Sequence, residues 1–218
     1  MKTAIVIGAT GLIGRQLTNQ LLNDGRYNVV KIFVRRTLSI NNQKLVEHIV
    51  DFSHIEMWKN KLTGDELFSA MGTTIKQAGS KETQYTVDYT YQHETAKAAA
   101  ENGVKNYFLV SSTGANSKSK NFYLRIKGEL EESVAQLPFR KVVIFQPSFL
   151  LGERNEKRRG EKIGAALAKI LTMSIPWIKK YRPIEATVVA QAMIHSANHD
   201  TQNKLVKYSL DKIFEIAQ

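Results

Sequence analysis

The sequence predicts an α/β protein whose doubly wound, mostly parallel sheet carries helices on both faces and a small C-terminal cap. Three observations predict this fold class: apolar runs alternate with helical segments, a glycine-rich turn follows the first run, and the chain has 218 residues. Parallel neighbouring strands need crossover connections, which are usually helices. A chain of this length can bury one large core. We therefore predict a single domain, with its core at residues 1–147 and a cap at residues 148–218 that does not fold independently.

The strands are predicted from short, continuous apolar runs, which are typical of strands buried on both faces of a parallel sheet. The first run stops at Gly8 and the sixth stops before Pro147, and both residue types interrupt strands. Six runs fit this description: Thr3–Ile7, Val29–Val34, Leu45–Val50, Glu66–Met71, Lys105–Val110 and Arg140–Phe145. A last run, Lys204–Tyr208, is either a further strand or a loose edge.

The helices are predicted from apolar residues at helical spacing and from the glycines that end them. Leucines at this spacing begin at Leu12, and Gly25 closes that helix. Gly103 closes a later, alanine-rich helix. The predicted helices are Leu12–Leu22, His54–Lys61, Val87–Asn102, Asn121–Ala135, Ile163–Met173 and Glu185–Ala197. The segment Ile75–Gln84 shows no periodicity and is predicted to be a loop.

The composition narrows the classes of protein to which the chain can belong. It has no cysteine, which excludes disulfides and thiolate metal sites. His195 and His199 have a spacing that can bind a metal, but further ligands are missing, so we predict a surface pair and no metal site. The apolar run Ala4–Ile7 is too short for a signal peptide, and no apolar stretch approaches the ~20 residues of a membrane span. We therefore expect a cytoplasmic protein that does not enter a membrane.

The formal net charge is +11, and much of the excess is local. Two clusters hold it: Arg154, Lys157, Arg158, Arg159 and Lys162, followed by Lys179, Lys180 and Arg182. Such clusters are typical of a solvated basic surface, or of a surface that recruits an anionic cofactor or substrate. No aromatic-and-basic binding motif accompanies the charge, so nucleic acid is not the expected partner.

A glycine motif joins the first predicted strand to the first predicted helix. The spacing G-x-x-G-x-x-G is formed by Gly8, Ala9, Thr10, Gly11, Leu12, Ile13 and Gly14. Gly8 permits a tight turn, Gly11 lets backbone N–H groups approach a pyrophosphate, and Gly14 lets the helix pack closely on the sheet. The free amides and the dipole of the helix start attract phosphate groups. This context predicts a dinucleotide site, and a glycine-rich turn with no ligand is the alternative.

The end of the second predicted strand bears on the choice of cofactor. NAD-binding proteins commonly carry an acid about 20 residues past the glycine motif, where it binds the ribose hydroxyls. Here the strand ends in Arg35 and Arg36, with no acid. Arginine can bind a 2′-phosphate by paired, charge-assisted hydrogen bonds, whereas a carboxylate would repel it. The sequence therefore favours NADP(H) over NAD, with two plain surface arginines as the alternative.

These features resemble the short-chain dehydrogenase/reductase superfamily, whose members have NAD(P)-binding Rossmann domains. The resemblance is to its atypical or extended branch, which includes nucleoside-diphosphate-sugar epimerase-like proteins. It implies cofactor contacts by Asp51 with the adenine, by Met71, Gly72 and Thr73 along the cofactor, and by Pro147 against the nicotinamide carboxamide, unless Pro147 only ends its strand. Four stretches extend the resemblance over nearly the whole chain, to the Tat-interacting-protein-like proteins: VIGATGLIGRQL, MGTTIKQAGS, VSSTGANSKSKNFYLRIKGE and FQPSFLLGERNEKRRGE.

Tyr123 and Lys127 have the Y-x-x-x-K spacing of that superfamily, on the helix after the fifth predicted strand. Residues i and i+4 share one helix face, so the phenol and the ammonium can point toward the same ligand. A nearby ammonium favours the phenolate, and Tyr123 could then exchange a proton with a hydroxyl or carbonyl group. The resemblance implies that Lys127 also binds the nicotinamide ribose. The alternative is a packed tyrosine beside a solvated lysine.

A hydroxyl at the end of the fifth predicted strand completes the predicted catalytic group. Ser111, Ser112 and Thr113 compete for this position. Strand ends in such sheets face the ligand, so one of these hydroxyls should bind the substrate oxygen. We favour Ser112 as the catalytic hydroxyl, with Ser111 next and also as a cofactor contact. The alternative for each is an ordinary strand-end cap.

The predicted function is an NADP(H)-dependent oxidoreductase that acts on a small carbonyl, alcohol or sugar-like substrate. Tyr123 is the predicted acid/base, Lys127 the residue that tunes it, and Ser112 the group that orients the substrate. The alternative is an NADP(H)-binding redox-sensing or regulatory protein with little or no turnover, which the short segment after the sixth strand favours. The helices Val87–Asn102 and Asn121–Ala135 form the dimer interface in many members of the superfamily, so the resemblance also allows a homodimer.

Overall fold

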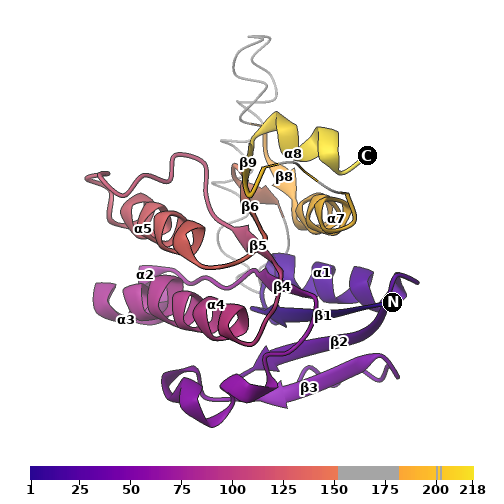
Figure 1. Cartoon of the computed structure of the whole chain (residues 1–218). Coiled ribbons are helices and arrows are strands. Elements are labelled where there is room, and N and C mark those ends of the chain that lie inside the picture. Colours follow the sequence, from indigo (N-terminus) through magenta and orange to yellow (C-terminus); the bar gives the residue numbers. More distant parts are fainter. Residues whose placement is uncertain (152–181, 200, 202) are drawn as a thin grey trace.

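The computed structural model describes residues 1–151, 182–199, 201 and 203–218 (Figure 1). Its sheet has the strand order β3-β2-β1-β4-β5-β6-β9, and every neighbouring pair is parallel. The strands are β1 (Lys2–Ile7), β2 (Tyr27–Val34), β3 (Leu45–Ile49), β4 (Glu66–Ser69), β5 (Asn106–Val110), β6 (Lys141–Gln146) and β9 (Leu205–Ser209). The chain winds from β1 out to β3 and returns to the other side of β1 with β4. The doubly wound prediction is therefore confirmed, and such sheets bind ligands where the winding reverses.

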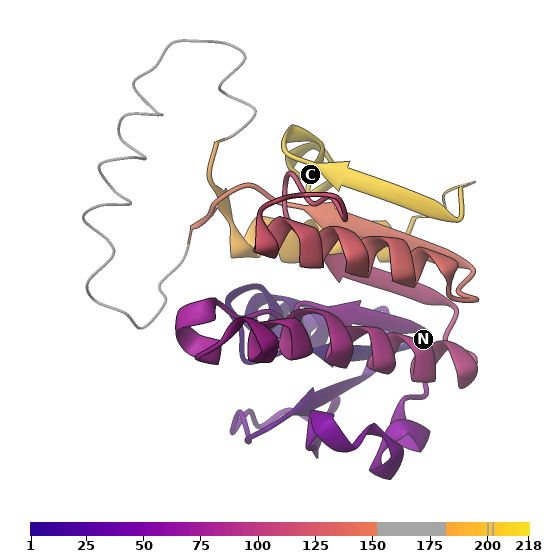
Figure 2. The same cartoon turned by 90° about the vertical axis from the view of Figure 1, so that its left-hand side faces the viewer.

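Helices cover both faces of the sheet (Figures 1 and 2). On one face lie α1 (Leu12–Asn23) and α7 (Ala186–Ala197), and on the other lie α4 (Tyr91–Glu101) and α5 (Phe122–Gln136). Alternate residues of a strand point to opposite faces, and β1 shows how this builds two cores. Ala4 and Val6 join the hydrophobic cluster that includes α1 and α7, whereas Ile5 and Ile7 join the cluster that includes α4 and α5. All four side chains are fully buried, so β1 is the centre of the molecule.

The prediction of a loop at Ile75–Gln84 is wrong. Two short helices, α2 (Ile75–Ala78) and α3 (Lys81–Tyr85), occupy this segment. Each follows a residue, Thr74 or Ser80, whose hydroxyl accepts a hydrogen bond from a backbone amide of the first turn. These caps satisfy amides that a helix start leaves free, so short helices form here without a long apolar stripe.

The helix predicted at Val87–Asn102 begins with a π-helical turn, η3 (Thr86–Thr90), which continues directly into α4. α3 leads straight into this turn, so the three segments form one continuous helical stretch. π-helical turns are rare and are frequently found at functional sites. This one contains Asp88, whose side chain is fully buried.

The remaining elements are short. They are the 3₁₀ helices η1 (Phe52–Met57) and η2 (Lys59–Lys61), where one helix was predicted at His54–Lys61, the helix α8 (Asp211–Ile216), and the paired strands β7 (Leu150–Leu151) and β8 (Ile184–Glu185). The uncertain run Lys204–Tyr208 forms β9, which extends the main sheet beside β6. The predicted helix Ile163–Met173 and both basic clusters, except Arg182, lie outside the described residues.

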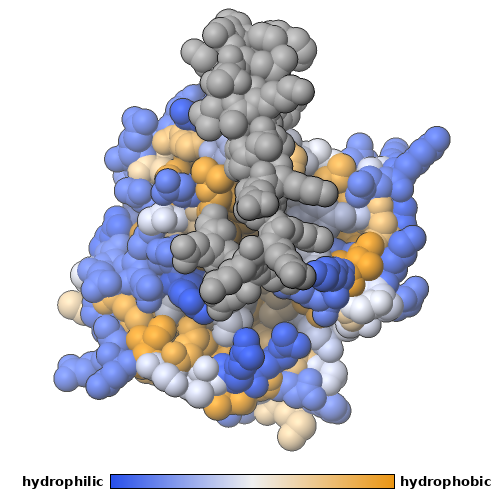
Figure 3. All heavy atoms as spheres, turned by 180° about the vertical axis from the view of Figure 1, so that it is seen from behind, coloured by the Kyte–Doolittle hydropathy of each residue, from blue (hydrophilic) through white to orange (hydrophobic). Residues whose placement is uncertain are grey.

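The described part of residues 148–218 is continuous with the rest of the fold, because α7 packs beside α1 and β9 belongs to the sheet. None of the helices described here combines the length and the apolar character needed to cross a lipid bilayer. Seen from behind, the surface is largely hydrophilic, with separate groups of hydrophobic atoms between the polar ones (Figure 3).

Candidate functional site

Close backbone approaches build the glycine turn between β1 and α1. Gly8 has a φ of +81°, and a Cβ there would lie 2.5 Å from the backbone carbonyl carbon of Ala70. A Cβ on Gly14 would overlap the carbonyl oxygen of Gly8. Neither position accepts a side chain unless the backbone moves. α1 therefore starts directly against the end of β1 and the turn that follows β4.

The first turn of α1 has no side-chain cap. Gly11 is its N-cap residue, and no side chain there accepts a hydrogen bond from the helix amides. Thr10 is exposed and Leu12 is half-buried, while the Ile13 side chain packs in the core. Uncapped amides together with the helix dipole make this helix start suitable for an anion.

Arg35 and Arg36 follow β2, the neighbour of β1, so they lie at the same edge of the sheet as the glycine turn. Both side chains are exposed. Within the described ranges, neither guanidinium group forms a hydrogen bond or an ion pair. Guanidinium groups that no carboxylate neutralises are available to an external anion.

Asp51 follows β3 and caps the short helix η1. Its carboxylate accepts hydrogen bonds from the Ser53 hydroxyl at 2.6 Å and the Ser53 amide at 2.9 Å, and it contacts His54 Nδ1 at 3.1 Å. These contacts, with the Ser53 hydroxyl first, lower the pKa of Asp51 to about 2. Asp51 thus has a clear local role as a cap, and its contact with adenine stays a prediction.

The turn after β4 is formed by Met71, Gly72 and Thr73, and the buried Asp88 holds it in place. Asp88 Oδ1 accepts a hydrogen bond from the Thr73 amide at 3.0 Å, and Oδ2 accepts one from Gln84 Nε2 at 3.2 Å. A Cβ on Gly72 would lie only 3.1 Å from Asp88 Oδ1. The glycine therefore leaves room for the carboxylate beside the turn.

Tyr123 and Lys127 share one face of α5 but differ sharply in exposure. Tyr123 is 37% exposed and Lys127 is 3% exposed. The Lys127 ammonium lies 5.9 Å from the centre of the Tyr123 ring and 3.6 Å from Asp88 Oδ1. A separation of 3.6 Å makes an ion pair but not a hydrogen bond. In the part of the chain that the structure describes, no acceptor is hydrogen-bonded to the ammonium of this nearly buried residue.

The three candidate hydroxyls after β5 have different partners. Ser111 donates to the buried Glu131 at 2.5 Å, and Thr113 donates to the Gln146 carbonyl at 2.7 Å. Among the described residues, the one hydrogen bond of the Ser112 hydroxyl is long, at 3.4 Å to the neighbouring Thr113 carbonyl. Of the three hydroxyls, that of Ser112 therefore forms the weakest hydrogen bond within the protein.

Pro147 connects the end of β6 to the segment after β5. The residue is buried, and its carbonyl accepts a hydrogen bond from the Thr113 amide at 3.1 Å. β6 ends at Gln146, so Pro147 does terminate the strand. Its contact with a nicotinamide carboxamide stays a prediction.

The predicted site residues thus fall into two groups at the carboxyl edge of the sheet. Arg35, Arg36 and Asp51 follow the strands on one side of β1, and the turn at Gly72 and the candidate hydroxyls follow the strands on the other side. The second group is joined to α5, because a Cβ on Gly72 would lie 3.8 Å from Lys127 Nζ. The glycine turn lies between the two groups.

Sequence reasoning missed Asp88 and its partner Gln84. The available signal was the position of Asp88 in the helical pattern, on a row of buried residues that begins with Gln84 and continues with Gln92 and Ala96. An acid on the buried row of a helix needs a partner. The sequence does not reveal that partner, because Lys127 lies far along the chain on another helix.

Comparison with known proteins decides the family. Residues 8–163 match a family described as NAD(P)H-binding, a range that includes the glycine turn, both arginines and Lys127. The chain belongs to this NAD(P)H-binding family. The predicted resemblance to NAD(P)-binding Rossmann proteins is therefore confirmed, while the choice between NAD and NADP is not decided by the match.

Relatives that match this NAD(P)H-binding chain over most of their own length occur in fungi. "Protein FMP52, mitochondrial" of Candida glabrata is 34% identical over 216 residues, which cover 95% of this chain and 91% of the relative. The protein of the same name in Aspergillus niger is 32% identical over 205 residues, which cover 90% and 87%. These names contradict the predicted cytoplasmic location. The prediction was wrong because the length of apolar runs does not distinguish the compartments inside a cell.

Solved structures share the fold of this chain. A UDP-N-acetylglucosamine 4-epimerase from Methanobrevibacter ruminantium, in complex with UDP-N-acetylmuramic acid, aligns with a TM-score of 0.72 and 17% identity, over 98% of this chain and 80% of its own. A short-chain dehydrogenase/reductase superfamily protein from Agrobacterium tumefaciens, with bound NAD, aligns with a TM-score of 0.69 and 14% identity, over 95% and 77%. At these identities the likeness shows the fold, which is the predicted Rossmann type.

Proposed function

We propose that the protein is an NADP(H)-dependent oxidoreductase of the atypical short-chain dehydrogenase/reductase type, acting on a small carbonyl, alcohol or sugar-like substrate. The environment of Lys127 carries this proposal. The residue is 3% exposed, yet the carboxylate of its ion-pair partner Asp88 is 3.6 Å from the ammonium, beyond hydrogen-bonding distance. A ligand could supply the hydrogen-bond acceptors that the described residues do not give this ammonium. Tyr123, one turn earlier on α5, is exposed enough to reach the same ligand.

The residues at the carboxyl edge fit a dinucleotide. The uncapped start of α1 would bind its diphosphate, and the side-chain-free approach at Gly8 and Gly14 lets the backbone come close. Arg35 and Arg36 would bind a 2′-phosphate, and the Lys127 ammonium would donate to ribose hydroxyls. The nicotinamide, when bound, would supply or accept a hydride.

The protein would contribute proton transfer and orientation. Tyr123 would donate a proton to the substrate oxygen when a carbonyl is reduced, and would accept one when an alcohol is oxidised. The charge of Lys127 would stabilise the phenolate that remains on Tyr123. Ser112, whose hydroxyl is the least committed, would donate a hydrogen bond to the same substrate oxygen and so orient it. A sugar-like substrate is suggested by the structural relative named as a UDP-N-acetylglucosamine 4-epimerase.

A substrate panel tests the proposed turnover. The full chain is mixed with NADPH and a panel of aldehydes, ketones and keto-sugars, and loss of the reduced nicotinamide absorbance is measured. At least one substrate should be reduced, and Tyr123→Phe should abolish this while NADPH binding persists, because only the proton donor is removed. Tyr107→Phe removes a phenol from the buried core and should retain turnover. NADPH binding with no turnover across the panel would instead favour a redox-sensing or regulatory protein.

The choice of NADP(H) is tested at the two arginines. Replacing Arg36 by Ala should weaken NADPH binding by roughly tenfold, the loss expected for one charge-assisted hydrogen bond, with little effect on NADH. Arg35→Ala should act in the same direction. Fluorescence titration with both cofactors gives the ratio of dissociation constants. Equal losses for NADPH and NADH in both variants would remove the case for 2′-phosphate recognition.

A further inference from the structure

Large apolar and aromatic side chains are exposed in several segments at the carboxyl edge of the sheet. They are Ile75, Tyr123, Phe149, Leu150 and Leu151. Ile75 begins α2, Tyr123 lies in the first turn of α5, and Phe149 directly precedes β7. Phe149 is 71% exposed and Ile75 is 45% exposed, so the described protein does not cover either of them. Apolar side chains that gather in one region, unlike those scattered singly, mark sites of interaction such as ligand grooves.

Backbone hydrogen bonds place Phe149 next to the segment that carries Ser112. The Thr113 amide donates to the Pro147 carbonyl at 3.1 Å, two residues before Phe149. The Phe149 carbonyl accepts a hydrogen bond from the Ile184 amide at 2.9 Å, which fixes the backbone at this position. Because Ser112 directly precedes Thr113, the candidate catalytic hydroxyl and the exposed phenyl ring belong to neighbouring segments.

Tyr123 and Ile75 belong to segments that meet the same region. A backbone amide of the segment after β5 donates to the Leu124 carbonyl at 3.0 Å, next to Tyr123. The turn that leads into Ile75 also meets α5, because a Cβ on Gly72 would lie 3.8 Å from Lys127 Nζ. Figure 2 shows α2, the start of α5 and the segment after β6 on the side of the molecule to which the strands point.

The order of the strands sets the exposed side chains on both sides of the candidate hydroxyl. β5 lies between β4 and β6 in the sheet, and all three strands are parallel. Ile75 follows β4, Ser112 follows β5 and Phe149 follows β6. The proposed catalytic group is therefore flanked by an exposed apolar residue from each neighbouring strand end.

Polar side chains beside these apolar residues are engaged within the protein. The Thr74 hydroxyl accepts a hydrogen bond from a backbone amide of α2, and the Ser148 hydroxyl donates to the Arg182 carbonyl at 2.5 Å. A sugar presents hydroxyl groups on several sides, and a site that binds one offers polar partners for them. A hydrocarbon chain needs no such partners, and its burial against Ile75 and Phe149 is favourable.

We propose that the substrate is an apolar aldehyde or ketone, or the corresponding alcohol, whose hydrocarbon part packs on Phe149 and Ile75. The inference rests on the proposed function, because it names the substrate class of the same site. In the reducing direction, the carbonyl carbon receives a hydride from NADPH and the carbonyl oxygen receives the proton of Tyr123. The products are the alcohol and NADP⁺, and Tyr123 regains its proton from water. Tyr123 and Ser112 bind the oxygen, and the exposed apolar side chains bind the rest of the molecule.

A series of straight-chain aldehydes from propanal to octanal tests the proposal in the full chain with NADPH. The parent kcat/KM should rise about fourfold for each added methylene group, the gain for burying one such group, until the apolar surface is covered. Phe149→Ser should reduce this rise to about twofold or less per methylene group, and Ile75→Ser should act in the same direction. Both side chains are exposed, so neither change should unfold the protein. Met57→Ser is the matched control, because it removes an exposed apolar side chain on η1 and should keep the dependence of the parent.

Binding of prodan, an apolar fluorescent ketone, separates this proposal from the proposed function. Its emission should shift to shorter wavelength when the full chain is added, hexanal should displace it and fructose should not. Phe149→Ser should bind prodan about tenfold more weakly than Met57→Ser does. Binding that depends on Phe149 in a protein without turnover would sustain the apolar site and defeat the oxidoreductase.

The apolar site would be overturned in two ways. If aldehydes or keto-sugars are turned over, an equal dependence on chain length in the parent and in Phe149→Ser would overturn it and leave the oxidoreductase in place. If no substrate is turned over, prodan binding that is absent or that Phe149→Ser leaves unchanged would overturn it.

Discussion

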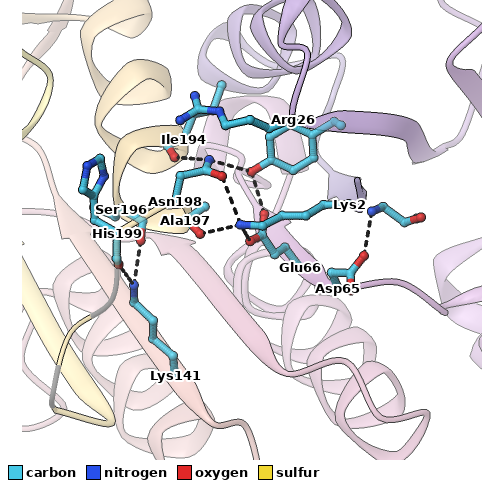
Figure 4. Close-up of polar contacts among 12 residues, drawn as sticks. Lys2, Arg26, Asp65, Glu66, Lys141, Ile194, Ser196, Ala197, Asn198 and His199 are labelled. Atoms are coloured by element: carbon cyan, nitrogen blue, oxygen red, sulfur yellow. Dashed lines mark hydrogen bonds and ion pairs between the residues drawn. The ribbon is translucent and has the colours of Figure 1, made fainter.

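The lysines at the two edges of the sheet, formed by the amino ends and by the carboxyl ends of its strands, differ in their hydrogen bonds. At the amino edge, the Lys141 ammonium donates to the carbonyls of Ser196 and His199, both at 2.6 Å (Figure 4). Lys2 donates to Glu66 at 2.6 Å and to two further acceptors near the end of α7. The last carbonyls of a helix lack intrahelical partners, and these lysines supply them. The amino edge thus carries a hydrogen-bond network that fixes the end of α7 to β1 and β6.

At the carboxyl edge, Lys127 is as deeply buried as Lys141 but has no hydrogen-bonded acceptor in the described part of the chain. The comparison separates two roles for the same residue type. A lysine whose donors are bound within the protein contributes to stability, whereas the proposed function gives the donors of Lys127 to a ligand. Substitution at the two edges should therefore affect different properties of the protein.

The largest expected effect is on turnover, for Lys127→Met. The change removes the charge beside Tyr123 and the donors to the cofactor, so turnover should fall roughly 100-fold or more. The free energy of unfolding should fall as well, because the fully buried Asp88 loses its cation and keeps only its bonds to Thr73 and Gln84. Steady-state kinetics and urea unfolding of the same samples measure both quantities. Unchanged turnover would show that Lys127 has no part in catalysis.

The next effect is on stability, for Lys141→Met. Two carbonyls at the end of α7 lose a donor, which should lower the free energy of unfolding by roughly 2 kcal/mol. NADPH binding should be unchanged, because this lysine lies at the other edge of the sheet. Urea unfolding and cofactor titration of the variant test the pair of expectations. A Lys141→Met variant that keeps its full stability but binds NADPH more weakly would contradict the roles assigned to the two lysines.

The smallest effect is a pH dependence at the amino edge. Burial raises the pKa of Glu66 above its ordinary value, and its bonds to Lys2 and Tyr27 oppose this only in part. A raised pKa in the folded state gives stability at acid pH that is lost as the pH rises from the unfolded value through the folded one. Glu66→Gln lacks this loss, so its stability relative to the parent should increase from acid to neutral pH. The unfolding free energies of both proteins are measured at several pH values. A difference that stays constant or decreases from acid to neutral pH would refute this expectation.

The sequence predicted those parts of the molecule that depend on local patterns. β1, β4 and β5 follow from apolar runs, and the glycine turn follows from its spacing between a strand and a helix. The face shared by Tyr123 and Lys127 follows from helix geometry alone. The helices at Ile75–Gln84 were missed because hydroxyl caps, rather than an apolar stripe, define them.

The sequence could not predict features that depend on contacts between distant segments. Asp88 is one acid in a helix until the fold brings Lys127, Gln84 and Thr73 to it. The choice among three consecutive hydroxyls depends in the same way on Glu131 and on the end of β6, which occupy Ser111 and Thr113. Such partners lie far apart in the chain, so no spacing reveals them.

Calorimetric titration of the full chain with NADPH and NADH tests the central claim most directly, namely that the carboxyl edge is an unfinished network completed by a dinucleotide. The account predicts saturable heat with NADPH, weaker binding of NADH, and a loss of affinity in Lys127→Met but not in Lys141→Met. A folded, monodisperse sample that gives no heat with either cofactor, and no displacement of a fluorescent nucleotide, would contradict it.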